Sequence, residues 1–326
     1  MRILITGANG FLGSHVTERL QAQGHDLRLM LRRTSNLAFL EDVQGYERVE
    51  GDMRDTASLT RAVEGVEAVL HLSGLTTART EAEYHAVNGT GTANLVMAAA
   101  KAGASRFVAI SSLAAHGPSL DERPRPLTAP GRPVSAYGRS KWAGEVNTLA
   151  AREGIDVAVV RPSAVYGPRD KALVPLYRIA KLAGVFPLYG DGLNLASLIH
   201  VHDAADAIVS VVLSEFSSGS IYTISDGQLH TWRELVQSFS RALDRRIRTI
   251  PTPAVLYQTA GYAGGVASFL SRRALPLNPD QIRQMSQRYW VCDNTAITRD
   301  TGWKPRIEID EGLADTLAWY RRRRWL

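Results

Sequence analysis

The chain has 326 residues, of which 45% are hydrophobic and 21% charged, and its formal net charge is +6. This length and composition exclude a disordered protein, because so many apolar residues bury a sizeable core in one large or two smaller domains. The small positive excess is spread along the sequence apart from a cluster at residues 321–324, which argues against nucleic-acid binding. The cluster follows a helical pattern and is typical of a basic helix end, with contact to an anionic membrane as the alternative.

The N-terminal stretch "MRILITGANG" enters a strand and a turn directly and has no pattern of a secretion signal. The single cysteine, Cys292, excludes an intrachain disulfide and permits a reducing compartment. Residues 252–270 form the most apolar late stretch, but glycines and polar residues interrupt it, so we expect a substrate-facing or membrane-surface helix rather than a transmembrane one. These features predict a cytoplasmic protein.

Short β-rich runs alternate with longer helical patterns, from "RILIT" and "FLGSHVTERLQAQG" to "RFVAISS" and "DVAVVRP". This alternation predicts an α/β fold in which a doubly wound, parallel Rossmann sheet carries helices on both faces. Beyond about residue 165, Pro and Gly interrupt the pattern. We therefore expect a dinucleotide-binding domain with the catalytic residues in 1–165. Residues 166–326 are expected to form a smaller, mainly substrate-binding lobe, with some segments returning to the first domain.

The first turn carries three glycines, Gly7, Gly10 and Gly13, between a strand and a helix. Glycines at this spacing allow a tight turn, close approach of the backbone to a pyrophosphate and close packing of the helix. The helix N-terminus, with Phe11 and Leu12, favours the anion. The position after an N-terminal strand makes this motif specific for a dinucleotide.

Two arginines, Arg32 and Arg33, end the next strand where NAD-binding sites usually place a carboxylate. An arginine there pairs with the additional phosphate of NADP, so NADP is the predicted cofactor and NAD the alternative. A pair of solvated surface arginines is the competing interpretation. After the third strand, Asp52 and Met53 either reach the adenine edge or form an ordinary turn, and spacing does not separate these two hypotheses.

Tyr137 and Lys141 are four residues apart in "SAYGRSKWAGE" and so share one face of a helix. A neighbouring ammonium favours a phenolate, which would make the tyrosine a usable acid or base at neutral pH. The pair is common by chance, but here it follows a strand that ends in Ser111 and Ser112.

With "TGANGFLG", "GDMRD", "LHLSG", "ISSLAAHG", "YGRSK", "RPSAVYGP" and "SLIHVHDAADAI" in order, almost the whole sequence resembles the extended short-chain dehydrogenase/reductase family. The resemblance implies that Tyr137 is the general acid/base and that Lys141 holds the nicotinamide ribose and lowers the tyrosine pKa. It assigns Ser112 to orient the substrate oxygen. Ser112 is preferred over Ser111 because it stands five residues before Gly117, which matches the family spacing.

The resemblance also places Leu72, Ser73, Pro162 and Val165 near the cofactor, with Ser73 in place of a more usual alanine. Asn88 matches a family asparagine, for which a structural role and a proton relay both remain open. Family members often dimerise through the helix after "LHLSG" and the helix carrying the catalytic tyrosine. The resemblance therefore implies that this chain can form a homodimer.

Departures from the family pattern separate the possible reactions. Nucleotide-sugar members carry an asparagine and an arginine for the diphosphate where this chain has Ala164 and Ala196, and dehydratases carry an acid pair where it has Leu113 and Ala114. Epimerases tend to keep the carboxylate that Arg32 replaces. The sequence thus favours an NADP(H)-dependent carbonyl reductase or alcohol dehydrogenase, similar to the dihydroflavonol reductase and 3β-hydroxysteroid dehydrogenase branches. The alternatives are an NAD-dependent nucleotide-sugar epimerase and a non-catalytic NADP-binding regulatory protein.

The substrate is expected to be a fairly apolar small molecule, because the late stretch carries the aromatic side chains Tyr257, Tyr262 and Phe269 and no charge. Core packing explains these aromatics equally well.

Two histidines, His200 and His202, alternate in "IHVHD" on an expected strand with Asp203 beside them, but no third ligand with suitable spacing is evident. We predict no metal site and assign the pair a structural or substrate-lining role. His116 and Arg169 are expected to border the substrate pocket, without assigned chemistry.

Overall fold

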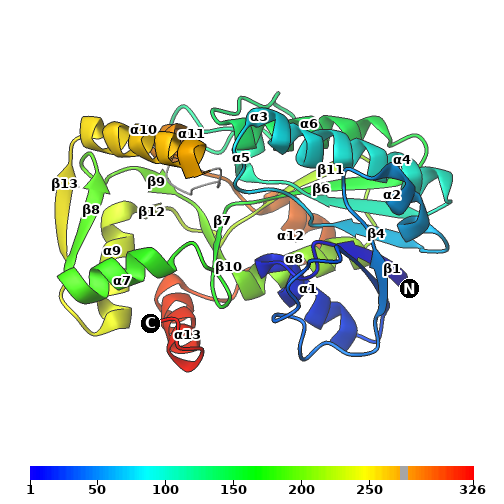
Figure 1. Cartoon of the computed structure of the whole chain (residues 1–326), viewed down its shortest axis with the longest axis horizontal. Coiled ribbons are helices and arrows are strands. Elements are labelled where there is room, and N and C mark those ends of the chain that lie inside the picture. The colour runs from blue at the N-terminus through cyan, green and yellow to red at the C-terminus, as the bar shows by residue number, and fades with distance from the viewer. Residues whose placement is uncertain (272–277) are drawn as a thin grey trace.

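The computed structural model of the chain describes residues 1–271 and 278–326. Figure 1 shows a broad sheet with its helices on the right and a smaller group of helices and short strands, which we call the small lobe, on the left.

Seven parallel strands form the central sheet, in the order β11-β6-β5-β4-β1-β2-β3. They are β1 (Arg2–Thr6), β2 (Asp26–Leu31), β3 (Glu47–Glu50), β4 (Ala68–His71), β5 (Arg106–Ile110), β6 (Asp156–Pro162) and β11 (Ser220–Ile224). The chain runs outward in one direction from β1 and in the other from β4. This reversal opens a crevice at the carboxyl ends of β1 and β4, where open α/β sheets bind their ligands. The predicted doubly wound fold is confirmed.

Helices cover both faces of the sheet because its strands are apolar on both sides. Ile3 and Ile5 of β1 pack on the face of α1, α8 and α12, whereas Leu4 packs on the face of α2 and α4. The first group comprises α1 (Phe11–Ala22), α8 (Val201–Leu213) and α12 (Thr295–Thr301). The second comprises α2 (Thr56–Val63), α3 (Glu81–Tyr84), the π-helix η1 (His85–Gly91), α4 (Thr92–Lys101) and α6 (Ala136–Ala150), with the short α5 (Leu113–His116) following β5.

The small lobe has its own aromatic core, in which Tyr177 lies edge-on to Phe239 and Tyr320. Its helices are α7 (Val174–Ala183), α9 (Trp232–Leu243), α10 (Ala254–Ser271), α11 (Pro279–Met285) and α13 (Ile309–Arg322). Its short strands are β7 (Ala164–Tyr166), β8 (Val185–Tyr189), β9 (Leu195–Ala196), β10 (Leu198–His200), β12 (His230–Thr231), β13 (Arg248–Thr252) and β14 (Tyr289–Trp290). Three elements of the second half, β11, α8 and α12, lie on the central sheet instead. Among the helices of the described residues, none has the length and hydropathy needed to cross a membrane.

The expectation that His200 and His202 alternate along one strand is wrong. Strand β10 ends at His200, and α8 begins at Val201. The ring Nδ1 of His200 accepts a hydrogen bond from the backbone N–H of His202 at 3.4 Å and thereby caps the helix. The pattern was too short to distinguish a strand from a helix start.

His71 is buried at the end of β4, where its ring nitrogens hydrogen bond with the hydroxyls of Thr6 (2.7 Å) and Thr92 (2.9 Å). Burial, followed by the charge of Lys141, lowers the pKa of His71 to about 3. An unfolded histidine binds its proton near pH 6.5. The unfolded chain therefore binds more protons than the folded one between these pH values, and stability falls as pH falls through this window.

As the pH falls from roughly 6 to 4, we expect His71 alone to lower the free energy of unfolding by about 1.4 kcal/mol for each pH unit. Urea unfolding at a series of pH values measures this slope. The variant His71→Gln should lose its share of the slope, whereas His85→Gln, at a half-exposed position on η1, should keep the wild-type slope. Equal slopes in wild type and His71→Gln would contradict the assignment.

Candidate functional site

The turn between β1 and α1 brings three backbone segments into close contact. Gly7 has a φ of +77°, and a Cβ at this position would lie 2.7 Å from the backbone nitrogen of Ser73. A Cβ at Gly13 would lie 2.1 Å from the carbonyl oxygen of Gly7. Side chains cannot occupy either position, so the glycines keep α1 close against the sheet. The first N–H groups of α1, at Phe11 and Leu12, have no partner within the helix and favour an anion at the crevice.

A cavity of about 340 Å³ opens at the reversal point of the sheet. Its lining comprises Gly7, Asn9, Gly10, Met30, Arg32, Ser35, Gly51, Asp52, Met53, Arg54, Leu72, Ser73, Gly74, Leu75 and Val87. Seven of the residues expected to bind the cofactor thus line one cavity. The others expected from the sequence lie outside this lining, namely Phe11, Leu12, Gly13, Arg33, Tyr137, Lys141, Pro162 and Val165.

The polar wall of this cavity contains a cation that the sequence analysis missed. Arg54 donates two hydrogen bonds from its guanidinium to the Asp52 carboxylate, each 3.0 Å long. These bonds, aided by the charge of Arg32, lower the pKa of Asp52 to about 2. Asp52 is therefore a paired carboxylate, and the wall carries two guanidinium groups for one carboxylate. The spacing of two residues in "GDMRD" was the available signal for this pair.

The three residues expected to be catalytic come from two elements beside each other. Ser112 follows β5 and caps α5, accepting a hydrogen bond from the N–H of Ala114 at 3.1 Å. Tyr137 and Lys141 lie in the first turns of α6, which Ser135 caps. The side chain of Ser112 lies close enough to Tyr137 to lower the pKa of its hydroxyl, against the larger effect of burial. The structure thus places the serine beside the tyrosine.

The expected lowering of the tyrosine pKa is not found in this structure. Burial raises the pKa of Tyr137, and the hydrogen bond with Ser112 offsets this only in part. The ammonium of Lys141 donates a hydrogen bond to the carbonyl oxygen of Ile110 at 2.6 Å. Burial lowers the pKa of Lys141 to about 8. Spacing alone does not report burial, and the same burial acts on both groups and disfavours the charged form of each.

Asn88 has a structural role in this arrangement. Its amide nitrogen donates to the carbonyl oxygen of Leu75 (3.0 Å) and to the hydroxyl of Ser140 (2.9 Å), and its amide oxygen accepts from the N–H of Leu75 (2.8 Å). Both donor hydrogens are therefore used. Asn88 lies in η1, and π-helical turns often occur at functional sites. It fixes α6 relative to the loop after β4, where a Cβ on Gly74 would lie 3.5 Å from the ammonium of Lys141.

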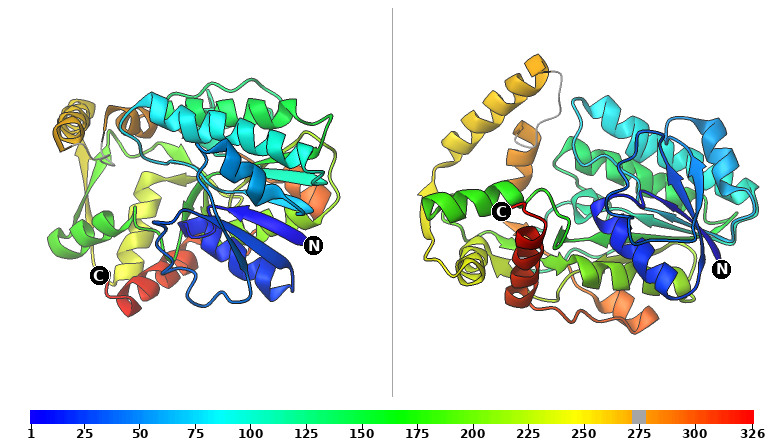
Figure 2. Two further views of the ribbon diagram at one scale, coloured as in Figure 1. Left: turned by 45° about the vertical axis from the view of Figure 1, so that its right-hand side comes forward. Right: turned by 60° about the horizontal axis from the view of Figure 1, so that its bottom comes forward.

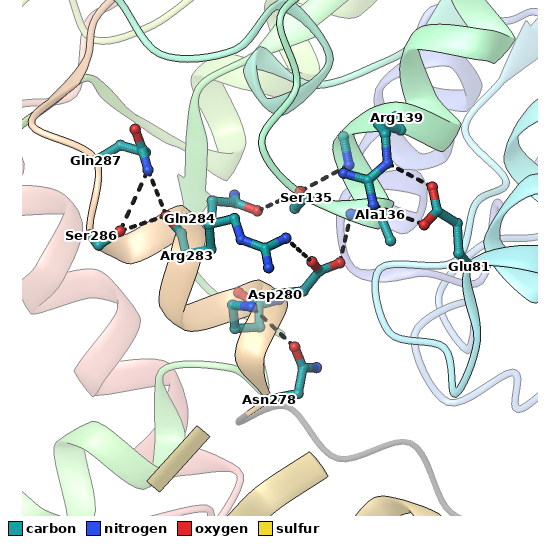
Figure 3. A network of polar contacts seen from close by, with 12 residues as sticks. Glu81, Ser135, Ala136, Arg139, Asn278, Asp280, Arg283, Gln284, Ser286 and Gln287 are labelled. Atoms are coloured by element: carbon teal, nitrogen blue, oxygen red, sulfur yellow. Dashed lines mark hydrogen bonds and ion pairs between the residues drawn. The ribbon is translucent and has the colours of Figure 1, made fainter. Parts of the chain in front are cut away.

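The small lobe contacts the start of α6 directly, as Figure 3 shows. The carboxylate of Asp280 in α11 accepts a hydrogen bond from the N–H of Ala136 at 2.6 Å, and the hydroxyl of Ser135 donates to Gln284 at 3.3 Å. The contacted residues immediately precede Tyr137. No pattern in the sequence points to this link, because Asp280 and Ala136 are 144 positions apart in the chain.

A buried ion pair supports α6 from the sheet side. Arg161 of β6 donates hydrogen bonds of 2.7 to 3.1 Å to both carboxylate oxygens of Glu145, and both side chains are fully buried. Glu145 stands one turn after Lys141 and raises the pKa of that lysine, against the larger effect of burial. The sequence analysis did not identify this pair.

The histidine pair has a third neighbour that the sequence did not reveal. Asp315 of α13 brings a carboxylate oxygen close to His200 and His202, so that one ligand atom from each of the three lies within 4.8 Å of the others. However, Nδ1 of His200 accepts a hydrogen bond, which places the hydrogen of the neutral ring on Nε2, the atom that faces Asp315 at 3.6 Å. A metal would need a free lone pair there. We assign the group to linking α8 with α13.

The remaining residues singled out in the sequence lie at different places. Arg169 forms an ion pair with Glu18 (2.5 Å) and donates to the Ser14 hydroxyl (2.9 Å), so it is bound to α1. His116 is buried, and burial lowers its pKa to about 4. Tyr257 donates to the carbonyl oxygen of Pro187 at 2.8 Å. Tyr262 is exposed, and the side chain of Phe269 lies outside the described residues.

Comparison with known proteins identifies the family. Residues 3–225 match the model of the NAD dependent epimerase/dehydratase family. The chain is 31% identical to a ceramide reductase of Caulobacter vibrioides, over 99% of this chain and 96% of the relative. It is 30% identical to a 2-alkyl-3-oxoalkanoate reductase of Stenotrophomonas maltophilia, over 96% and 97% of the two chains.

Among solved structures, a dTDP-glucose 4,6-dehydratase from Streptomyces venezuelae with NAD bound superposes with a TM-score of 0.79. The two chains are 27% identical, and the match covers 99% of this chain and 98% of that one. The seven-stranded parallel sheet agrees with these matches. This chain therefore belongs to the NAD-dependent epimerase/dehydratase family of extended short-chain dehydrogenases/reductases.

Proposed function

We propose that the protein is an NADP(H)-dependent oxidoreductase that interconverts a ketone and a secondary alcohol. The observation that carries this proposal is the arrangement of the site, in which Ser112 at the start of α5 lies beside Tyr137 of α6, one helical turn before Lys141. A hydroxyl pair of this kind can bind a carbonyl oxygen and transfer a proton to it.

The residues of the site have distinct roles in this reaction. Ser112 donates a hydrogen bond to the substrate oxygen and holds it beside the Tyr137 hydroxyl. Tyr137 gives its proton to that oxygen during reduction and removes it during oxidation. Lys141 is close enough to neutrality, with a pKa of about 8, to exchange a proton with its surroundings near neutral pH. The nicotinamide cofactor supplies or accepts the hydride.

The cavity at the reversal point fits a dinucleotide. Gly7 and Gly13 leave room for close backbone approach, and the N-terminus of α1 favours a pyrophosphate. At the polar wall, Arg32 and Arg54 provide two guanidinium groups, whereas Asp52 is held by Arg54. This excess of positive charge favours the additional phosphate of NADP over the ribose hydroxyl of NAD.

The substrate proposed for this site is fairly apolar. Leu113, Ala114, Ala164 and Ala196 stand where the family's dehydratases and nucleotide-sugar enzymes carry polar or charged groups. Two of the relatives are named as reductases, of a ceramide and of a 2-alkyl-3-oxoalkanoate. Both observations support reduction of a ketone without a nucleotide diphosphate.

A titration of the purified protein with NADPH and NADH, followed by fluorescence, tests the cofactor assignment. We expect tighter binding of NADPH, and Arg32→Asp should weaken it by about 10- to 100-fold through loss of a charge-assisted hydrogen bond. Arg33→Asp is the matched control, because Arg33 lies outside the cavity lining, and it should change affinity by less than about threefold.

The same preparation distinguishes the alternative functions. Denaturation should release no stoichiometric nucleotide from an enzyme that exchanges its cofactor. Tightly held NAD with no response to NADPH would instead support a nucleotide-sugar epimerase. Tight NADPH binding without oxidation of NADPH by any apolar ketone would support a regulatory protein.

A further inference from the structure

We propose that the small lobe docks on a membrane surface containing anionic lipids, through the outer faces of α7, β13 and α10. This inference goes beyond the proposed reductase activity and does not depend on it. The surface, which we call the α7–α10 face, combines exposed apolar side chains with a group of cations.

Helix α10 exposes Val255, Leu256 and Tyr262 on one side, and two of its glycines lie on the other. A Cβ on Gly261 would lie 2.6 Å from Ile282 of α11, and a Cβ on Gly265 would lie 3.3 Å from Pro279, so this side packs closely against α11. On the other side, Val255, Leu256 and Tyr262 are 61%, 57% and 67% exposed. A helix in contact with water normally has the opposite arrangement.

The sequence of α10 is unusual for a solvent-exposed helix. None of its 18 residues is charged, so it lacks the charged face that is common on surface helices. It does not qualify as a membrane span. Exposed apolar side chains fit the interface between lipid headgroups and acyl chains when cations lie beside them, and here neighbouring segments supply those cations.

The neighbouring elements extend this apolar surface. Helix α7 exposes Ile179 and Leu182, three residues apart and so on one face, with Leu182 79% exposed. Strand β13 exposes Ile250 and pairs with β8, which directly follows α7. Since the hydroxyl of Tyr257 donates to the carbonyl oxygen of Pro187, α10 is joined to the same strand, β8, that pairs with β13 and follows α7. Figure 2 shows α10 projecting at the end of the lobe, away from the central sheet.

The same end of the lobe is basic. Residues 174–189 and 244–271 contain five cations, Arg178, Lys181, Arg245, Arg246 and Arg248, against one carboxylate, Asp244. Arg245 lies beside α7, where its guanidinium donates to the carbonyl oxygen of Lys181. Within the described part of the chain, none of the five forms an ion pair with a carboxylate. Cations beside an apolar face select an anionic lipid surface over a second copy of this chain, whose matching face would repel them.

Co-sedimentation of the full chain with vesicles tests the proposal. We expect binding to vesicles of phosphatidylcholine mixed with phosphatidylglycerol, and binding at least about tenfold weaker to phosphatidylcholine alone. The variant Lys181→Glu/Arg248→Glu should lose at least about tenfold in affinity for the anionic vesicles. Its charge-matched control, Arg61→Glu/Lys101→Glu on α2 and α4, should bind like wild type.

The apolar contribution is tested with Leu182→Ser/Leu256→Ser/Tyr262→Ser, which we expect to reduce vesicle binding at least about tenfold. The control Leu120→Ser removes a side chain that is 87% exposed elsewhere on the surface and should have no effect. Urea unfolding of each variant verifies that it is folded.

Equal binding to neutral and anionic vesicles, or no binding to either, would overturn the proposal. The proposal would also be overturned if the α7–α10 face joined two copies of this chain. In that case analytical ultracentrifugation would show a dimer that the triple serine variant converts to a monomer, while vesicles fail to bind. NADPH titration reports separately on the reductase proposal, so the two can fail independently.

Discussion

Replacing Tyr137 with phenylalanine should lower kcat by about 10²- to 10⁴-fold while NADPH binding changes little. The substitution removes only the phenol oxygen, which lies beside Ser112, and keeps the ring. Without this phenol the proposed reaction loses the group that transfers a proton to the substrate oxygen, because the hydroxyl of Ser112 is a much weaker acid. The measurement is the steady-state rate of NADPH oxidation with the apolar ketone that the wild-type protein reduces fastest.

Tyr84→Phe provides the matched control. The ring of Tyr84 lies 6.1 Å from that of Tyr137, and its hydroxyl donates to the carbonyl oxygen of Thr76 at 3.2 Å. It has the same chemistry in the same region but no bond to Ser112, so we expect a change in kcat below about tenfold. Turnover retained in Tyr137→Phe would exclude Tyr137 as the general acid/base.

Local patterns were sufficient for much of the site. The positions of Gly7 and Gly13 predicted a close backbone turn because only glycine permits it, and the spacing of Tyr137 and Lys141 predicted a shared helix face because the helical period fixes it. The order of strands and helices likewise predicted the doubly wound sheet.

Contacts between distant segments could not be predicted in this way. Asp280 reaches the start of α6 from the far end of the sequence, and Asp315 approaches His200 from α13. No periodicity links such residues, because tertiary packing alone places them together. The pKa of Tyr137 depends on burial, which spacing does not report.

Replacing Glu145 with glutamine should lower the free energy of unfolding by about 3–5 kcal/mol. Arg161 is fully buried and makes its three closest side-chain bonds to Glu145. Glutamine has nearly the same shape but no charge, so the guanidinium would remain buried without its counter-ion. Urea unfolding of the purified variants measures the loss.

The exposed ion pair of Arg241 and Asp310, with a shortest distance of 2.9 Å, is the control for geometry without burial. Because solvent screens this pair, Asp310→Asn should cost no more than about 1 kcal/mol. A similar loss in both variants would mean that burial of the Glu145 pair adds nothing to its contribution to stability.

Since Glu145 also raises the pKa of Lys141, Glu145→Gln should shift any limb of the pH–rate profile that depends on Lys141 to lower pH. A limb that stays in place while stability falls would separate the structural role of Glu145 from any electrostatic role in catalysis.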